Sequence, residues 1–212
     1  MLFKYACFIS YVHSKSDKPS MMKEFVDELK LALLDELETI FEEDLFIDQD
    51  VLTGGTHFNE ALALALCQSF FMVVVYVPKY ENHPFCLKEF RAMELLERKR
   101  LQIAGRTGQY GMIVPIVLRG VEDLPDDIKS RIHYLDFSKY TTASSDIRKN
   151  PQYVEQIKQL AKEMGHLYRA FKHLDPCKDC DQFKLPDDAA ITPFRAAGKS
   201  PPSPFPGAEG AK

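Results

Sequence analysis

One acidic side chain, Glu89, lies near the predicted start of a helix, where its carboxylate could take part in catalysis. Glu89 lies in "PFCLKEF", residues 84–90, where a proline ends an apolar run and a helical pattern begins. A carboxylate in the first turn of a helix tends to stay ionised, because the positive end of the helix dipole favours its charge. Held in place, it can stabilise positive charge that develops on a substrate. The alternative is the commonest fate of a glutamate, a solvated position on a helix surface.

The other candidate positions lie at the ends of predicted strands. Ser10 and Tyr11 end one apolar segment, the double glycine Gly54–Gly55 follows a second, and the loop before Glu89 follows a third. In an open parallel sheet, ligands bind outside the carboxyl ends of the strands. Aromatic rings, a flexible turn and a carboxylate are therefore expected to meet at one edge of the sheet.

Alternating apolar segments position these loops. Continuous apolar, β-prone runs predict strands, and apolar residues at helical spacing predict helices. The predicted strands are 5–11, 44–50, 70–77 and 111–118, with a short fifth at 132–138. The predicted helices are 19–38, 58–68, 85–100 and 151–171. Short strands that alternate with helices predict an α/β fold, with a central parallel sheet of four to five strands and helices on both faces.

The composition is that of an ordinary globular chain and argues against two classes of partner. Of the 212 residues, 45% are hydrophobic and 27% are charged, and the net charge is −4. An acidic chain lacks the basic face expected for nucleic-acid binding. The longest apolar run, residues 70–78, is too short to cross a bilayer, and the first residues lack the apolar core of a signal peptide. A cytoplasmic location, with no nucleic-acid or membrane partner, is the simplest interpretation.

Residues 174–212 differ in character from the rest of the chain. They hold seven of the thirteen prolines, which predicts a flexible tail behind a domain at residues 1–173. The five cysteines are scattered and odd in number, unlike the framework of a disulfide-rich secreted protein. Cys177 and Cys180 form one C-x-x-C pair, which is half of a zinc site, and the chain has no second pair. We expect a flexible pair of thiols and no metal site.

Motifs typical of other α/β enzymes are missing. No G-x-G-x-x-G follows the first predicted strand, and the chain contains no G-x-x-x-x-G-K-[ST] phosphate loop and no G-x-S-x-G nucleophile elbow. This argues against a standard dehydrogenase, a P-loop enzyme and an α/β-hydrolase.

Four segments resemble the Toll/interleukin-1 receptor (TIR) domain family. The segment "YACFISY" resembles the first strand of the family. The segment "LFIDQDVLTGGTHFNEALALALCQSFFMVVVYVPKY" resembles its second strand, BB loop, second helix and third strand. The W-C-x-x-E pattern that opens the next helix is similar to "FCLKEF", and the fourth strand is similar to "IVPIVL". The segments occur in the order and spacing of the family, over roughly residues 3–170. The resemblance implies the flavodoxin-like TIR fold.

The same resemblance implies an activity. Some TIR domains are scaffolds that recruit other TIR domains, whereas others, common in bacteria, cleave NAD with a glutamate in the helix after the third strand. Glu89 matches that glutamate, so the resemblance implies a bacterial-type NAD glycohydrolase in immune or defence signalling. It would release nicotinamide and either ADP-ribose or a cyclic ADP-ribose, with no cofactor beyond NAD as substrate. The implied partners are NAD and, through self-association, other TIR domains.

The resemblance also indicates which residues would bind NAD around Glu89. Phe58 lies where the family places a stacking aromatic, and the glycine pair would let the loop move and let backbone N–H groups approach phosphates. Because the chain has no tryptophan, Phe85 stands where many members carry Trp, and the indole N–H is lost. The implied NAD-binding residues are Ser10, Tyr11, Gly54, Gly55, Phe58 and Phe85.

Other interpretations of these residues stay open. Phe58 is equally well explained as a core contact at the start of a helix, and Cys86 is better explained by packing than by nucleophilic chemistry. For the whole chain, the first alternative is a non-catalytic TIR adaptor whose "VLTGG" loop is a binding surface and whose Glu89 is structural. The second alternative is a sensor that binds nucleotides without cleaving them.

Overall fold

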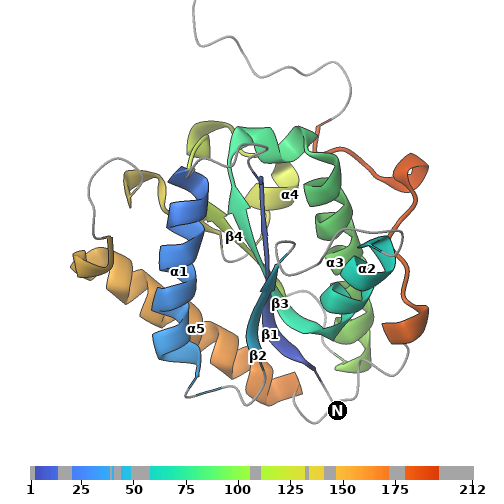
Figure 1. Cartoon of the computed structure of the whole chain (residues 1–212), viewed down its shortest axis with the longest axis horizontal. Coiled ribbons are helices and arrows are strands. Elements are labelled where there is room, and N and C mark those ends of the chain that lie inside the picture. The colour runs from blue at the N-terminus through green and yellow to red at the C-terminus, as the bar shows by residue number, and fades with distance from the viewer. Residues whose placement is uncertain are drawn as a thin grey trace, which may run out of the picture.

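Five parallel strands form the central sheet of this protein, seen here in a computed structural model (Figure 1). The structure describes residues 3–13, 21–38, 40, 58–105, 111–131, 134–140, 147–171 and 180–195, and the backbone alone of 44–48. The strand order is β2-β1-β3-β4-β5, and every neighbouring pair is parallel. The strands are β1 (Tyr5–Tyr11), β2 (Asp44–Asp48), β3 (Ser69–Tyr76), β4 (Ile113–Val117) and β5 (Leu135–Asp136). This confirms the predicted α/β class and the parallel sheet.

The central strand β3 explains why the sheet lies in the core. All eight residues of "SFFMVVVY" are buried, because helices cover the strand on both faces and leave no solvent-exposed side for polar residues. Branched and aromatic side chains fit this pleated, covered surface. The register pairs Cys7 of β1 with Phe71, and Val73 with Val114 of β4.

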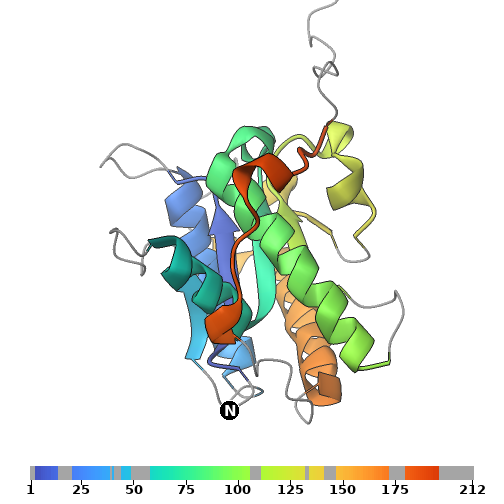
Figure 2. The same cartoon turned by 90° about the vertical axis from the view of Figure 1, so that its right-hand side faces the viewer.

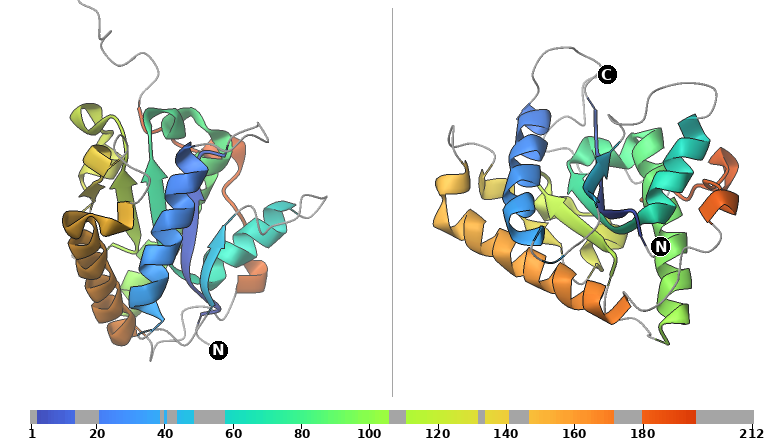
Figure 3. Two further views of the ribbon diagram at one scale, coloured as in Figure 1. Left: turned by 60° about the vertical axis from the view of Figure 1, so that its left-hand side comes forward. Right: turned by 60° about the horizontal axis from the view of Figure 1, so that its bottom comes forward.

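Helices cover the sheet in two layers. On one face lie α1 (Met21–Leu37) and α5 (Pro151–Phe171), which contact each other (Figures 1 and 3). On the other face lie α2 (Phe58–Gln68) and α3 (Pro84–Ile103), which also contact each other (Figure 2). Helix α5 buries one apolar stripe, which includes Ile157, Met164 and Phe171, and leaves its polar residues outward. A single turn, α4 (Asp126–Lys129), was not predicted.

The strand order creates a switch point between β1 and β3. From β1 the chain moves to the edge strand β2, and it then crosses back to add β3 on the opposite side of β1. The loops that leave the carboxyl ends of β1 and β3 therefore diverge, and a crevice between diverging loops is where this class of fold binds its ligands. The switch point places the end of "YACFISY" beside the segment that leads into "PFCLKEF".

Two boundaries differ from the sequence prediction for local reasons. Of the predicted fifth strand, 132–138, the structure describes residues 134–138, and among these Leu135–Asp136 form a strand that borders β4. Helix α3 begins at Pro84, because proline lacks the N–H that the first turn leaves unsatisfied, and it runs on to Ile103. Glu89 thus lies in the second turn of α3, beyond the first-turn reach of the helix dipole, so the predicted dipole contribution is wrong.

The expectation of a flexible thiol pair is wrong for Cys180. Its sulfur forms a disulfide with Cys67 of α2, across 113 residues of sequence and a Cα–Cα distance of 5.5 Å. The fold brings the two cysteines together, and no local spacing could reveal it. Residues 180–195 lie against α2 and α3 (Figure 2), whereas Cys177 and residues 196–212 are outside the described residues. The domain boundary at residue 173 stays a prediction.

Candidate active site

The side chains of Ser10, Tyr80 and Glu89 meet at the switch point between β1 and β3. Ser10 comes from the carboxyl end of β1, Tyr80 from the 3-10 helix η2 (Pro78–Asn82) after β3, and Glu89 from α3. Ser10 is 1% exposed, and Tyr80 and Glu89 are 0% exposed. Strand β1 and the neighbouring pair η2 and α3, which follow 70 or more residues later, thus bring a hydroxyl, a phenol and a carboxylate into one buried cluster.

Short hydrogen bonds join the three groups. The Ser10 hydroxyl donates to Oε2 of Glu89 at 2.5 Å, and the oxygens of Ser10 and Tyr80 are 2.7 Å apart. A serine hydroxyl has one proton, so when Ser10 donates to the carboxylate, Tyr80 must donate to Ser10. The proton order is therefore Tyr80 to Ser10 to Glu89, and both hydroxyls are aligned toward the carboxylate.

Burial keeps the neighbouring acids of this cluster protonated. The pKa of Tyr80 is raised well above its ordinary value, first by burial and then by the nearby Cys86 and Glu89. Burial, followed by the charge of Glu89, likewise raises the pKa of the Cys86 thiol. Cys86 points its sulfur at the carbonyl of Tyr11, 3.5 Å away. A protonated thiol is a poor nucleophile, which supports packing as the role of Cys86.

Glu89 does not have the solvated position on a helix surface that was the alternative interpretation of the sequence. It lies inside the molecule, and its described neighbours include the Ser10 hydroxyl. A buried carboxylate is costly unless hydrogen bonds compensate for the loss of water. Since no part of Glu89 reaches solvent, a ligand could touch this carboxylate only after neighbouring segments move.

The predicted aromatic residues do not all join this cluster. The rings of Phe58 and Phe85 pack edge to face, with centroids 5.6 Å apart, and Phe85 is 41% exposed. Phe58 is half-buried and packs against the core, as the core-contact interpretation expects, whereas its stacking role stays a prediction. Tyr11 is only 3% exposed, and its ring lies 4.0 Å from that of His13. Of these predicted aromatic residues, Phe85 is the exposed one.

Part of the predicted site lies outside the described residues. Gly54 and Gly55 belong to this part, so their role in NAD binding stays a prediction. In the described part of the chain, no three His, Cys, Asp or Glu side chains are grouped closely enough to hold a metal ion. The zinc alternative for the C-x-x-C pair also loses a ligand, because the sulfur of Cys180 is already bonded to Cys67.

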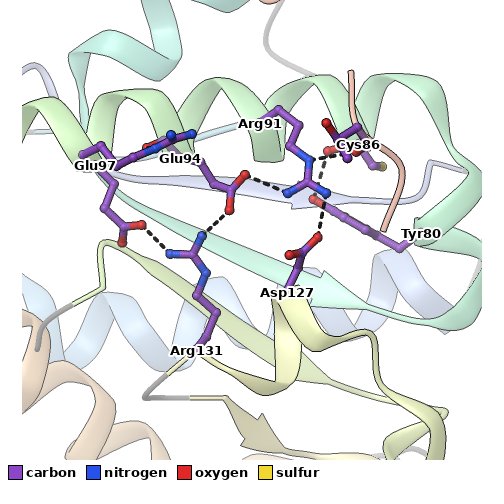
Figure 4. A network of polar contacts seen from close by, with 9 residues as sticks. Tyr80, Cys86, Arg91, Glu94, Glu97, Asp127 and Arg131 are labelled. Atoms are coloured by element: carbon purple, nitrogen blue, oxygen red, sulfur yellow. Dashed lines mark hydrogen bonds and ion pairs between the residues drawn. The ribbon is translucent and has the colours of Figure 1, made fainter. Parts of the chain in front are cut away.

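A second polar network holds α3 in place (Figure 4). Arg91 pairs with Glu94 at 2.7 Å and with Asp127 of α4 at 2.6 Å. Arg131 bridges Glu94, at 2.7 Å, and Glu97. Charged pairs that share partners at low exposure resist rearrangement better than isolated surface pairs. The network fixes the side of α3 that faces α4, so it anchors the helix that carries Glu89.

A model of the TIR domain family matches residues 7–150 of this chain. The chain belongs to the TIR domain family. The matched region includes the whole Ser10–Tyr80–Glu89 cluster, most of β1 and the whole of the other four strands. None of the curated proteins searched matches the chain. Membership supports a general role in signalling or defence and a tendency of TIR domains to associate with one another.

Sequence reasoning missed one member of the cluster in this TIR domain. Tyr80 lies in the loop that was predicted to carry the site, but its type and position alone do not separate it from other buried tyrosines. A signal was present, since Tyr80 follows the central strand by only four residues in "VPKYE". As for membranes, no helix in the described part of the TIR domain combines the length and apolar composition that a bilayer crossing requires.

Proposed function

We propose that this TIR domain is an NAD glycohydrolase that cleaves the bond between nicotinamide and ribose, with Glu89 as its catalytic residue. One observation carries the proposal. Glu89 lies at the switch point where this fold binds ligands, and a hydroxyl chain from Tyr80 through Ser10 is aimed at its carboxylate.

The chemistry requires little more than a positioned carboxylate. The nicotinamide leaving group is a cationic pyridinium in NAD, so it departs without protonation by a general acid. Positive charge then moves to the ribose, in a transition state like an oxocarbenium ion. The negative charge of Glu89 would stabilise that ribose, and the hydroxyl of Ser10 would hold the carboxylate in one orientation. Ser10 and Tyr80 are positioning residues in this scheme.

The substrate would need surfaces for its rings and phosphates. Phe85, with its exposed ring, and its partner Phe58 would stack against nicotinamide or adenine. Tyr11, in its buried position, would line the site near Cys86 rather than stack. Gly54 and Gly55 would let the BB loop approach the phosphates. Capture of the ribosyl cation by water gives ADP-ribose, whereas capture by an adenine nitrogen gives a cyclic product.

The buried state of Glu89 suggests that activity depends on assembly. A ligand reaches the carboxylate only when neighbouring segments move, and contacts with a second TIR domain could supply that movement. We place the activity in cytoplasmic immune or defence signalling, with NAD as substrate and no other cofactor.

The same burial supports a second candidate, a non-catalytic TIR adaptor. A carboxylate that is enclosed and hydrogen-bonded can serve the fold alone, by tying α3 to β1. Under this candidate the protein would act through TIR–TIR contacts and leave NAD intact.

Nicotinamide release from NAD separates the two candidates. The full chain is assayed dilute and at high concentration with a crowding agent, which favours assembly, and products are resolved by chromatography. Glu89→Gln keeps the size and hydrogen-bonding capacity of the side chain but removes its charge. It should lower the rate by about 10²–10³. The matched control is Glu155→Gln on α5, an exposed carboxamide change on the other face of the sheet, which should leave the rate unchanged.

Two results would decide against the enzyme. Absence of nicotinamide under every assembly condition would favour the adaptor. Release that survives Glu89→Gln at full rate would remove Glu89 from the mechanism, provided that circular dichroism shows the variant to be folded.

A further inference from the structure

Residues 180–195, here called the strap, run along the outer side of α3 after the chain leaves α5 (Figure 2). The disulfide to Cys67 attaches the start of the strap to α2. Farther along, Lys88 pairs with Asp188 at 2.6 Å, and Arg91 donates to the carbonyl of Thr192 at 2.9 Å. These contacts are to α2 and to α3, the helix that carries Glu89.

The far end of the strap is held by one ring and one guanidinium. Phe194 is 8% exposed and packs edge to face on Phe90, with centroids 4.9 Å apart, and its centroid lies 6.1 Å from that of Tyr80. Arg195 bonds Glu81 at 2.6 and 3.0 Å and Asp123 at 3.1 Å. The strap therefore ends beside the ring whose hydroxyl belongs to the Ser10–Tyr80–Glu89 cluster.

Between its two ends the strap has polar contacts with α3, through Asp188 and Thr192, but no buried residue. Of its residues, Cys180 and Phe194 are buried, and those between them are half-buried or exposed. Its regular structure consists of two short 3-10 turns, Cys180–Gln182 and Asp188–Ala190. Segments with few buried contacts open at low free-energy cost. The disulfide, which limits how far an opened strap can move, is thus a major part of its attachment.

A cavity of about 360 Å³ lies beside this disulfide, between α2, α3 and the strap. Cys67 lines it, together with Leu95, Phe183 and the two lysines Lys99 and Lys184. Both lysines are exposed, and none of the described residues that line the cavity is acidic. A molecule that enters this space would meet Cys67, one partner of the disulfide, and two lysine side chains, whose positive charges favour an anion.

We propose that the Cys67–Cys180 disulfide is a thiol–disulfide exchange site, that it takes a small anionic thiol through this cavity, and that exchange releases the strap from α3. The incoming thiolate attacks the sulfur of Cys67, the S–S bond breaks, and Cys180 leaves as a thiolate that takes a proton. A second thiol of the same kind attacks the mixed disulfide and frees Cys67. The protein gains two electrons and two protons, and the reductant ends as its own disulfide.

Release of the strap would change the neighbourhood of the candidate site. Phe194 would leave its contacts with Phe90 and Tyr80, and the strap would no longer cover that side of α3. The inference does not depend on the proposed function, because disulfide chemistry and strap release are measured without NAD.

The test uses the oxidised full chain and two thiols of opposite charge, glutathione and cysteamine. Samples are quenched with an alkylating reagent at intervals, unfolded and weighed by mass spectrometry, and reduction should add two alkyl groups. Per thiolate, glutathione should react about threefold to tenfold faster than cysteamine, since two surface charges each contribute modestly. In a Lys99→Gln, Lys184→Gln variant that preference should disappear. Cys177→Ser, which keeps both bonded cysteines, should behave as the wild type.

Hydrogen–deuterium exchange of the same samples reports the strap. Reduction should raise the exchange of residues 180–195 several-fold and should also raise that of η2, where Tyr80 lies. Cys180→Ser should reproduce the reduced pattern without any thiol. Three outcomes overturn the proposal: equal alkylation before and after reduction, no preference for glutathione in the wild type, and strap exchange that stays the same on reduction. The comparison of oxidised with reduced wild type needs no variant, so it tests the proposal even if Cys180→Ser folds poorly.

Discussion

The hydrogen bond from Tyr80 to Ser10 can be removed with almost no change of shape. Tyr80→Phe deletes one hydroxyl from a ring that is 0% exposed and leaves its packing against Phe194 and Tyr76 in place. The Ser10 oxygen then loses its incoming donor while it still donates to Glu89. The variant thus separates the hydrogen-bond chain from the packing around it.

The size of the effect follows from the geometry. A neutral buried hydrogen bond contributes about 0.5–1.5 kcal/mol net, and one that leads to a charged group contributes more, about 1.5–3 kcal/mol. Tyr80 reaches the carboxylate of Glu89 only through Ser10, so we expect a loss of about 1–2 kcal/mol in the free energy of unfolding. The contact of Tyr80 with the carbonyl of Cys86, at 3.3 Å, is long and adds little.

Urea unfolding followed by circular dichroism measures this loss. With a slope of about 2 kcal/mol/M, the midpoint should fall by about 0.5–1 M while the slope stays unchanged. Tyr134→Phe, at a tyrosine that is 38% exposed, is the matched control and should shift the midpoint far less. If the protein also cleaves NAD, Tyr80→Phe should lower kcat more than it changes KM, because the carboxylate would be held less firmly.

A double-mutant cycle with Ser10→Ala tests the reasoning. In the Ser10→Ala background Tyr80 has no hydroxyl to donate to, so Tyr80→Phe should cost about 1 kcal/mol less than in the wild type. Strict additivity of the two changes would refute the hydrogen-bond chain and leave Tyr80 as a packing residue.

Three further predictions concern the fold around the site. Burial raises the pKa of the Cys7 thiol from 9.0 to about 12. The native state therefore keeps this proton to higher pH than the unfolded state, so the free energy of unfolding should fall between pH 9 and 12. Cys7→Ala should make this fall with pH less steep, by up to about 1.4 kcal/mol per pH unit, as measured by urea unfolding at a series of pH values. Gly120 has φ +77°, and a Cβ there would lie 2.8 Å from Cγ of Pro78, whereas at Gly105, with φ +61°, it would meet nothing within 4 Å. Gly105→Ala should cost about 1–2 kcal/mol for the left-handed backbone alone, and Gly120→Ala distinctly more, measured by the same unfolding assay; equal losses would contradict the steric reasoning. Glu97→Ala removes the acceptor of a buried backbone N–H and of a guanidinium, so it should lower the free energy of unfolding by about 3–5 kcal/mol. A loss below about 1 kcal/mol would show that these two contacts contribute little to stability.

Sequence pattern by itself determined the element order and the class of the fold. The unbroken apolar run of β3 and the stripe of α5 are local signals, because burial on both faces or on one face dictates which residue types each position accepts. The strand ends are likewise local, so Ser10, at the end of β1, and Glu89, which follows β3, could be predicted at one edge of the sheet. The resemblance to TIR domains pointed to Glu89 within that edge.

Tertiary structure decided what surrounds those residues. Strand order is set by packing of whole elements, so only the fold shows that β3 lies beside β1 and that Tyr80 reaches Ser10 across 70 residues of sequence. The burial of Glu89 depends on neighbours from three elements and left no mark in "PFCLKEF". The bond between Cys67 and Cys180 is the clearest case, since 113 residues separate two cysteines whose spacing carries no signal. Local residue types determine which elements form, whereas contacts between distant residues exist only once those elements have packed together.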